Sequence, residues 1–404
     1  MATAVDIVIV GGGLSGLALA AQLAAPRFSH LTVLVLENRT HYVRDRTWSY
    51  WHTAPHAYSH LERMRWNQWR VSQTDSQIPA KKIQCPTEKR AALHSSQTAY
   101  CSIDADAFYH HALSAIENSP HVHLRRGTSV RRLQDVDAHH SFPVVSTATG
   151  DEISAQWVFD ARPTAPPQYG GLVQQFVGWE VHTPRDVFDR STVDLMAFEP
   201  SPHGLHFFYV LPYSPRAALV ESTWVSPAAH QPNYDRELRD YLEKQFDVTE
   251  FDLAYQERGV LNLQQGPALS GRRVVALGRG AGTLRPSTGY AFLDTLQHAQ
   301  ALANSLVDLP TRALQEWKPP QFKRSVRDTW MDRVFLDVLQ SDWQNSAHYF
   351  MQLFERVEAD TLVAFLNGHA SWAQRLTIAK ALPALPFAKA AVARLVGTGQ
   401  GHKP

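Results

Sequence analysis

The stretch VDIVIVGGGLSG, Val5–Gly16, decides the fold of this chain. Its first six residues form a short, mostly apolar run typical of a buried parallel strand, and glycines follow. The next segment, LSGLALAAQLAA (14–25), is rich in Ala and Leu and predicts a helix, and LTVLVLE (31–37) predicts a second strand. Strand, glycine loop, helix and strand in this order predict a βαβ unit that binds a dinucleotide.

The glycine loop has the G-x-G-x-x-G spacing, in which each glycine has a physical role. We expect Gly11 to permit the tight turn, Gly13 to let the backbone approach the pyrophosphate, and Gly16 to allow close helix packing. The helix N-terminus then binds the phosphates. Glu37 stands about 20 residues further on, at a strand end, where its carboxylate can accept ribose hydroxyls. The cofactor contacts expected here are Gly11, Gly13, Leu14, Ser15, Gly16 and Glu37.

NAD and FAD share this fingerprint, so the choice between them depends on a later segment, ALGRGAGTLRPSTGYAFLDTLQ (276–297). It predicts a strand, a glycine-rich loop with Pro286 and Gly289, and a helix beginning near Tyr290. This arrangement resembles the second FAD contact of hydroxylase-like flavoproteins, in which the helix N-terminus faces the pyrimidine oxygens of the isoalloxazine. Many of those flavoproteins have Gly-Asp at the strand end, whereas this chain has Gly278-Arg279. Because the loop and helix resemble this flavin contact, we expect the bound dinucleotide to be FAD.

Composition narrows the partners and the compartment. Lys and Arg (39) nearly balance Asp and Glu (38), so no basic field attracts nucleic acid. The two cysteines, Cys85 and Cys101, and a beginning without the basic region of a secretory signal favour a reducing cytoplasm. No apolar run approaches the ~18 residues of a membrane-spanning helix. Eleven tryptophans suit a large apolar ligand or a lipid interface, and an aromatic-rich core explains them equally well.

The expected fold class is α/β. It comprises a Rossmann-like FAD-binding domain of the hydroxylase-like type, an inserted antiparallel β-sheet domain for substrate, and a helical C-terminal region. The middle of the chain alternates aromatic and β-branched residues, as antiparallel strands do. The predicted boundaries are 1–50, 86–165 and 266–310 for the FAD-binding domain, 51–85 and 166–265 for the substrate domain, and 311–404 for the helical region.

The tail AKALPALPFAKAAVARLVG (379–397) is apolar with basic residues interspersed, as in a helix that lies on a membrane surface. A helix packed on its own domain is an equally good interpretation. A peripheral position on the inner face of a membrane is thus one expectation. The histidine pairs at 110–111 and 139–140 lack metal-ligand spacing with Cys or carboxylate partners, so no metal is expected.

Five patches in order along the chain resemble the FAD-dependent lycopene cyclases, in particular the bacterial lycopene β-cyclase type. DRTWSYW (45–51) is similar to that family's His-Thr-Trp-Ser segment, and FDARP (159–163) to its Asp-Gly-Arg segment. QFVGWEV (175–181) and the region from FYVLPYS to ALVESTW (208–224) resemble its middle sheet, which carries an acidic motif. LRPSTGYAF (284–292) resembles its His-Pro-Thr-Thr-Gly-Tyr flavin segment, where the usual Gly-Asp is also absent.

The resemblance implies a non-redox, acid-catalysed cyclisation of the acyclic ends of lycopene to β-ionone rings, with reduced FAD as cofactor and NAD(P)H as its reductant. Glu221 is then the acid or cation stabiliser, although strand alternation alone favours a surface position for it. Trp48 is the strongest candidate for cation–π stabilisation among the possible tunnel residues Trp48, Tyr50, Trp51, Trp179 and Trp224. Further cofactor contacts implied by the resemblance are Arg46, Asp160, Gly278, Pro286, Thr288, Gly289 and Tyr290.

Three departures from the family pattern keep alternatives open. Ala161 stands where the family usually has Gly, Arg285 where it often has His, and Ser222 where the acidic motif usually has a second acid. Ser222 leaves Glu221 as the one carboxylate of that motif. The alternatives are a monooxygenase of the aromatic-hydroxylase type, a cyclase of the same mechanism acting on another isoprenoid, and a carotenoid- or lipid-binding flavoprotein without turnover.

Overall fold

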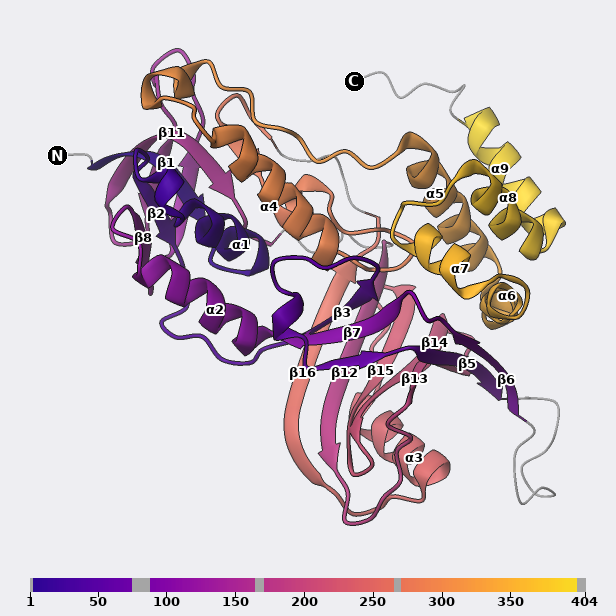
Figure 1. Ribbon diagram of the computed structural model, residues 1–404. Helices are drawn as coiled ribbons and strands as arrows, with labels where there is room; N and C mark the ends of the chain where they lie inside the picture. The colour runs from indigo at the N-terminus through magenta and orange to yellow at the C-terminus, as the bar shows by residue number, and fades with distance from the viewer. Residues whose placement is uncertain (1–2, 75–87, 164–170, 265–269, 398–404) are drawn as a thin grey trace.

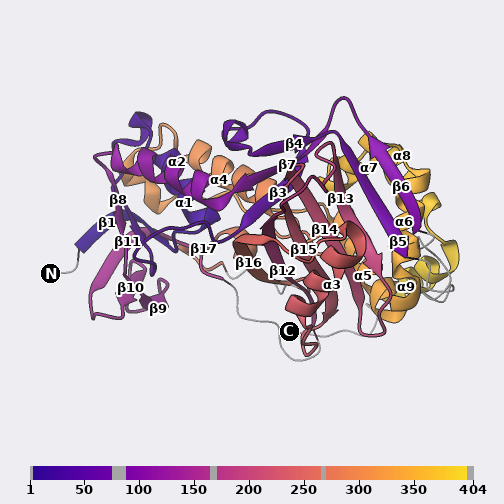
Figure 2. The same cartoon turned by 90° about the horizontal axis from the view of Figure 1, so that it is seen from below.

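The computed structural model describes residues 3–74, 88–163, 171–264 and 270–397. Two large sheets lie side by side and are linked by a small third sheet, and the C-terminal helices gather at the far end of the second sheet (Figures 1 and 2). This is the architecture that the sequence predicts: a nucleotide-binding α/β lobe, an antiparallel sheet and a helical C-terminal region. Cys85 lies outside the described residues.

The nucleotide-binding sheet has the strand order β8-β2-β1-β11-β10-β9, and β17 pairs with β11. Its strands β8, β2, β1, β11 and β17 run parallel, and the connection from β1 to β2 is a helical crossover through α1. Both faces of β1 are buried, with Ile7 and Ile9 packed against the helices and Val8 and Val10 in a second cluster. The strands are β1 (Thr3–Val10), β2 (Val33–Leu36), β8 (Val122–Arg125), β9 (Val130–Gln134), β10 (Val144–Thr147), β11 (Glu152–Asp160) and β17 (Val274–Ala276). The helices are α1 (Leu14–Leu23), α2 (Ala105–Glu117) and α4 (Phe292–Leu306).

The second sheet has the order β16-β12-β15-β14-β13-β5-β6, antiparallel throughout except for the β13–β5 pair. Helix α3 (Tyr234–Phe246) covers one face, and the C-terminal helices cover the other, so apolar residues alternate between two cores along each strand. The strands are β5 (Gln68–Thr74), β6 (Glu88–His94), β12 (Leu172–His182), β13 (Thr192–Glu199), β14 (Leu205–Ser214), β15 (Ala217–Pro227) and β16 (Asp252–Asn262).

The small sheet β3-β7-β4 lies between the lobes, and its strands are β3 (Thr47–His52), β4 (Met64–Trp66) and β7 (Ala99–Asp104). The C-terminal helices are α5 (Val326–Ser341), α6 (Trp343–Arg356), α7 (Ala359–Leu366), α8 (Trp372–Ala381) and α9 (Ala384–Gly397). Within the described residues, no single helix is both long and apolar enough to cross a membrane. Helices α8 and α9 pass that test only as a pair, which is bent by 118°.

The chain passes from one lobe to the other at places that differ from two of the expected domain boundaries, those at residues 86 and 310. Strand β6, expected within the FAD-binding segment 86–165, pairs with β5 and so forms the edge of the second sheet. After residue 310 the chain still packs on the first lobe, because Leu314 and Trp317 join its core before α5 begins. Helix α4 begins at Phe292, two residues after the predicted start.

Candidate active site

The glycine loop after β1 has the geometry that a pyrophosphate needs. Gly11 adopts φ +101°, and a Cβ on Gly16 would collide with the carbonyl oxygen of Gly11, so helix α1 packs against the turn as predicted. A Cβ on Gly13 would meet no atom within 4 Å, which leaves open space at the N-terminus of α1. These residues fit a dinucleotide phosphate at that helix end.

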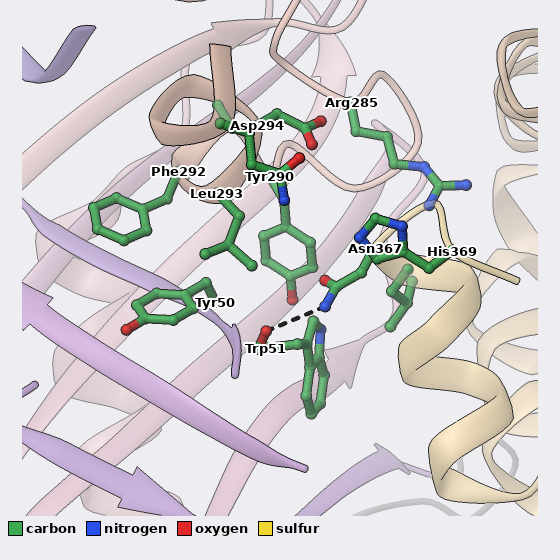
Figure 3. A pocket seen from close by; sticks show the side chains of 12 residues that line it. Tyr50, Trp51, Arg285, Tyr290, Phe292, Leu293, Asp294, Asn367 and His369 are labelled. Atoms are coloured by element: carbon green, nitrogen blue, oxygen red, sulfur yellow. Dashed lines mark hydrogen bonds between the residues drawn. The ribbon is translucent and has the colours of Figure 1, made fainter. Parts of the chain in front are cut away.

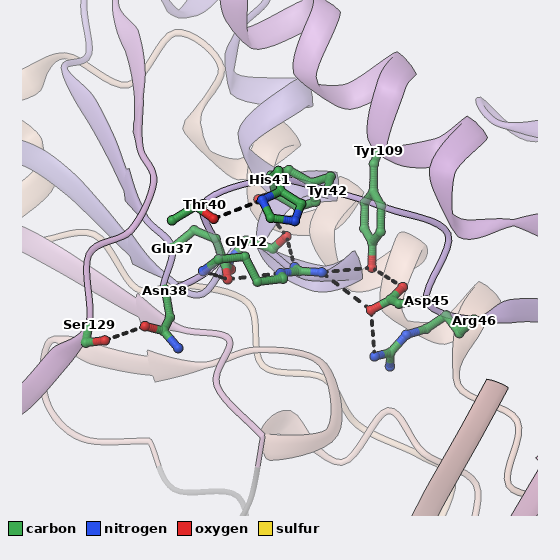
Figure 4. Close-up of polar contacts among 11 residues, drawn as sticks. Gly12, Glu37, Asn38, Thr40, His41, Tyr42, Asp45, Arg46, Tyr109 and Ser129 are labelled. Carbon is green, nitrogen blue, oxygen red and sulfur yellow. Dashed lines mark hydrogen bonds and ion pairs between the residues drawn. The ribbon is translucent and has the colours of Figure 1, made fainter. Parts of the chain in front are cut away.

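Glu37 lies buried at the end of β2, directly beside the glycine loop (Figure 4). Its carboxylate accepts hydrogen bonds from the backbone N–H of Gly12 at 2.5 Å and from the backbone N–H and Nε of Arg39 at 2.8 and 3.0 Å. Burial works against the charge, but the hydrogen bonds from Arg39 and Gly12 hold the pKa of Glu37 below its ordinary value. Arg39, which the motif does not include, also donates to the Gly12 carbonyl at 2.8 Å.

Other expected cofactor residues meet at the carboxyl ends of β1, β11 and β17. Asp160 is in register with Val10 on one side and Ala276 on the other, and it accepts two hydrogen bonds from the Arg162 guanidinium. Gly278 adopts φ +55°, and a Cβ there would lie 2.8 Å from Oγ of Ser15. Ligands of open α/β sheets bind at this edge.

Arg46 lies further along the same side, at the end of a polar chain (Figure 4). It donates to Asp45 at 3.0 Å, and Asp45 in turn accepts from the hydroxyl of Tyr109 at 3.0 Å. The Tyr109 hydroxyl also accepts a long hydrogen bond of 3.4 Å from Arg39. These hydrogen bonds connect Arg46 to the Glu37 carboxylate.

The loop 284–291, before α4, is tightly turned and forms an ion pair with a helix outside its own lobe. Gly289 adopts φ +72° and its N–H donates to the Arg285 carbonyl at 2.8 Å, while the Tyr290 N–H donates to Oγ1 of Thr288. The buried guanidinium of Arg285 forms an ion pair with Asp332 of α5 at 3.0 Å. Arg285, which stands where the family often has His, therefore ties the expected flavin loop to the C-terminal helices.

An apolar cavity lies between this loop, one face of the second sheet and helices α5 to α7. Its walls include Trp51 of β3, Tyr209 of β14, Thr288 and Tyr290 of the loop, and Leu366 at the end of α7. A second pocket adjoins it around Tyr290 and Trp51, where the side-chain amide of Asn367 donates to the Trp51 carbonyl at 3.1 Å (Figure 3). The cavity therefore brings the expected flavin loop and the sheet together around a mostly apolar space.

Glu221 lies on the cavity face of the sheet. It is directly opposite Tyr209 on β14, and Val225, four residues along the same strand, also lines the cavity. Burial and the nearby Glu257 carboxylate raise the pKa of Glu221 to about 8, against a hydrogen bond from Thr223. The neutral acid is therefore the main form at pH 7, as proton donation requires.

Glu257 of β16 is a second carboxyl on this face, and the sequence motifs did not point to it. It is 4% exposed, and burial raises its pKa to about 7, against hydrogen bonds from Tyr255 and Thr47. The position is recognisable only from strand register, because Glu257 lies 36 residues beyond the acidic motif and is paired with it through β12.

Ser222, next to Glu221 in sequence, points to the opposite face of the sheet. Its hydroxyl donates to Glu237 of α3 at 2.6 Å and lies 3.1 Å from Nε2 of His206. Trp224 shares this face, where its indole N–H donates to Glu237 at 3.1 Å. A second acid at position 222 would therefore face α3 and not the cavity.

The aromatic residues considered for a tunnel are divided among three places. Trp51 lines the apolar cavity and Tyr50 the adjoining pocket. Trp179 and Trp224 belong to the core beneath α3, on the far face of the sheet. Trp48 packs in the first lobe, with its ring centroid 5.6 Å from Phe292 at the start of α4 and 5.4 Å from Phe108.

One group of possible metal ligands occurs among the described residues, formed by His52, Glu62 and Cys101 with ligand atoms within 4.8 Å of one another. The Glu62 carboxylate already accepts hydrogen bonds from Tyr50 at 2.5 Å and from Arg65, and it lies 2.7 Å from Nδ1 of His52. Burial raises the pKa of the Cys101 thiol far above its ordinary value. Hydrogen bonding within the protein accounts for this cluster, and we assign no metal to it.

A model of the lycopene cyclase protein family matches residues 6–392. The chain belongs to the lycopene cyclase family. The lycopene beta-cyclase of Paracoccus sp. (strain N81106 / MBIC 01143) is 24% identical to it over 400 residues, which cover 95% of this chain and 96% of that protein. The family resemblance found in the sequence is thereby confirmed over nearly the whole chain.

Solved structures similar to this lycopene cyclase family member show its fold class. A geranylgeranyl bacteriochlorophyll reductase-like protein of Thermoplasma acidophilum has a TM-score of 0.61 at 12% identity, covering 96% of this chain and 99% of that one. The p-nitrophenol 4-monooxygenase of Pseudomonas putida has a TM-score of 0.57 at 14% identity, covering 97% and 99%. The flavin-dependent monooxygenase PieE, solved with FAD and substrate, has a TM-score of 0.55 at 14% identity, covering 96% and 72%. The hydroxylase-like flavoprotein fold is confirmed.

Proposed function

We propose that this protein is a lycopene β-cyclase that closes the acyclic ends of lycopene into β-ionone rings by acid catalysis. The observation that carries the proposal is Glu221, a carboxyl whose neutral form is favoured, on the cavity face of the sheet. Membership of the lycopene cyclase family and the similarity to a lycopene beta-cyclase support the choice of substrate.

The reaction needs one proton and no net oxidation. The Glu221 carboxyl gives its proton to the terminal double bond, and the resulting tertiary cation is attacked by the next double bond. Loss of a neighbouring proton then completes the ring, so the product is an isomer of the substrate. A pKa of about 8 keeps the proton on Glu221 at neutral pH, and the apolar lining of the cavity excludes water that would trap the cation.

We further propose that the first lobe binds FAD, which acts in its reduced form and takes its electrons from NAD(P)H. The glycine loop and Glu37 would hold the adenosine and phosphate portion, and the loop at Pro286, Thr288, Gly289 and Tyr290 would meet the ring. Support comes from the open space at Gly13 and from the flavoprotein fold. When bound, the reduced flavin supplies an electron-rich ring that stabilises a nearby cation.

A membrane surface is the proposed source of the hydrocarbon substrate. The support is a group of exposed apolar side chains on the last two helices, among them Trp372 (64% exposed) and Leu385 (82% exposed). Large exposed apolar groups near basic side chains, such as Lys389 on α9, suit the boundary between lipid and water. The protein would then act in the cytoplasm, bound peripherally to the inner membrane face.

The deciding experiment expresses the chain in a lycopene-accumulating bacterium. Conversion of the red pigment to an orange cyclised product, identified by its absorption and retention time, is the expected result. Soluble yellow protein without any change of pigment would contradict the proposal and favour another isoprenoid or a binding role.

The second candidate, a monooxygenase, is favoured by the similarity of the fold to p-nitrophenol 4-monooxygenase. It would consume one NAD(P)H and one O₂ for each product. Oxygen uptake and NADPH loss are therefore measured against product formed, and the cyclase proposal requires both to fall far below one per turnover.

A further inference from the structure

Three neighbouring strands place two carboxyl groups on either side of a residue without a side chain. Gly178 of β12 is in register with Glu221 of β15 on one side and with Glu257 of β16 on the other. Because adjacent strands are about 4.8 Å apart, the Cα atoms of the two glutamates are about 10 Å apart. Directly aligned residues share one face of the sheet, so both side chains project toward the same side.

The side chain of Glu257 extends over Gly178 toward β15, the strand that carries Glu221. A Cβ built on Gly178 would lie 3.2 Å from Cγ and 3.5 Å from Oε1 of Glu257, and also 3.2 Å from Cδ1 of Leu219 on β15. The missing side chain of Gly178 therefore makes the room into which the Glu257 carboxyl extends. Any other residue at 178 would separate the two acids.

The groups around Glu257 bind its carboxyl without giving it a cation of its own. The Tyr255 hydroxyl donates to Oε2 at 2.9 Å, and Thr47 donates through its backbone and side chain. Arg44 is nearby, but its guanidinium is paired with Glu180 at 2.6 Å and Asp104 at 3.1 Å. Within the described ranges, no salt bridge to Glu257 is found.

The groups around Glu221 are also uncharged. Tyr209 stands opposite it, Thr223 donates to its Oε1 at 2.5 Å, and the hydroxyls of Tyr100 and Tyr290 are close enough to interact with Tyr209. Burial raises the pKa of each of these tyrosines, so none is ionised at neutral pH. The charge that acts on Glu221 is the Glu257 carboxylate, whereas the charge that acts on Glu257 is the Arg44 guanidinium.

We propose that Glu257 is the positioning partner of the acid Glu221, and that its carboxylate acts across Gly178 to keep the proton on Glu221. This inference rests on the proposed function. Repulsion between the two neighbouring carboxylates keeps at least one proton on the pair, and that proton is held for Glu221 to donate. When Glu221 protonates the CH carbon of the terminal double bond, the electron pair of that bond forms the new C–H bond and leaves a tertiary cation on the carbon that bears the two methyl groups. The proton lost at ring closure returns to the carboxylate pair, so no oxidant or reductant is consumed.

This pairing explains how the protein can have Ser222 in place of the second acid of the family motif. The acid missing from the family motif at position 222 would point toward α3, whereas Glu257 provides a second carboxyl on the cavity face of the sheet. The pairing comes from strand register and not from adjacent positions in one motif.

The test is the pH profile of lycopene cyclisation by the flavin-loaded E257Q variant, with reduced flavin and lycopene in vesicles. Gln keeps the size of the side chain and removes the like charge, so the pKa of Glu221 falls and Glu221 ionises at lower pH. We expect the alkaline limb of the profile to move down by about one pH unit.

Two further variants separate positioning from structure. G178A inserts a Cβ between the acids and should move the alkaline limb in the same direction. E237Q is the matched control, because Glu237 contacts the neighbouring residue Ser222 on the opposite face, and its profile should match the wild type. Flavin content, read from absorbance, confirms that each variant is folded.

An unshifted profile for E257Q would overturn the inference, as would an equal shift in E237Q. If E257Q fails to retain flavin, G178A decides by the same criterion. Absence of product from the wild-type protein contradicts the proposed function instead, so the two failures are distinguishable.

Discussion

The two faces of β15 differ far more than their one-residue offset in sequence suggests. On the cavity face, the half-buried Glu221 and the buried Glu257 are carboxyls whose pKa values are raised to about 8 and about 7. On the face toward α3, Glu237 is bonded to Ser222 and Trp224, and burial, with His230 nearby, lowers the pKa of His206 to about 3. One face thus holds protons at neutral pH and the other holds a histidine without its proton.

The difference teaches that a polar residue in a sheet takes its chemistry from its face. The cavity face leaves Glu221 and Glu257 without a salt bridge in the described residues, beside an apolar space, which favours proton donation. The α3 face satisfies its polar groups with hydrogen bonds in a closed core, which favours stability. Five predictions test this comparison, from the largest effect to the smallest.

E221Q should lower the cyclisation rate by about 10² to 10⁴-fold, the range for loss of a general acid, while flavin binding is retained. The amide cannot donate an acidic proton to an alkene. Initial rates with reduced flavin measure the effect, and S222A on the opposite face is the matched control. A loss of less than tenfold would show that Glu221 is not the acid.

D332A should destabilise the protein by about 3 to 5 kcal/mol, because it leaves the buried guanidinium of Arg285 without its partner. This ion pair holds the helices over the cavity face. Urea unfolding measures the loss. The double variant R285M/D332L, which removes both charges, should be more stable than D332A, and the reverse order would contradict the role of the pair.

His206 should make the α3 face sensitive to acid. Its pKa is lower in the folded protein than in the unfolded chain, so its contribution to stability is present above about pH 6.5 and is lost as the pH falls toward 3. Between pH 6.5 and pH 4.5 the wild type should lose about 2 kcal/mol more than H206Q in chemical unfolding. Parallel curves for the two proteins would show that His206 does not titrate in this way.

The stability contributed by Glu221 on the cavity face should depend on pH in the opposite sense. A carboxyl with a raised pKa contributes stability at low pH, and this contribution is lost as the pH rises toward 8. In chemical unfolding, the H206Q variant should lose this stability toward alkaline pH as the wild type does.

S222A should cost about 1 kcal/mol of stability, the usual value for one hydrogen bond, and should leave the cyclisation rate within about twofold. Thermal unfolding and initial rates check both numbers. A large loss of activity in S222A would mean that the α3 face takes part in the chemistry, which would end the distinction between the faces.

The parts of this molecule that could be predicted are those encoded by neighbouring residues. Gly11, Gly13, Gly16 and Glu37 form a local pattern, and the structure brings them together at one sheet edge. Strand type and the division into lobes followed from alternation and glycine positions. The Arg39 contact to Glu37 was missed, although it lies only two residues away, because the dinucleotide motif assigns that carboxylate to the ribose alone.

The parts that could not be predicted depend on register between strands far apart in sequence. Glu257 lies across Gly178 from Glu221 only because β12 lies between β15 and β16. The place of Ser222 could not be predicted for the same reason, since adjacent residues of a motif point to opposite faces of a strand. The place of β6 was also missed, because its pairing with β5 is not encoded in either segment.

The ion pair between Arg285 and Asp332 has a consequence for the order in which the protein is made. The loop that contains Arg285 leaves the ribosome before its partner, which follows 47 residues later, and the Phe365 carbonyl that also accepts from Arg285 follows 80 residues later. Until then the guanidinium has no buried partner and the loop lacks its final support. The final support of this loop therefore waits until α5 and α7 have been made, and a nascent chain stopped before α5 would present this loop unfinished.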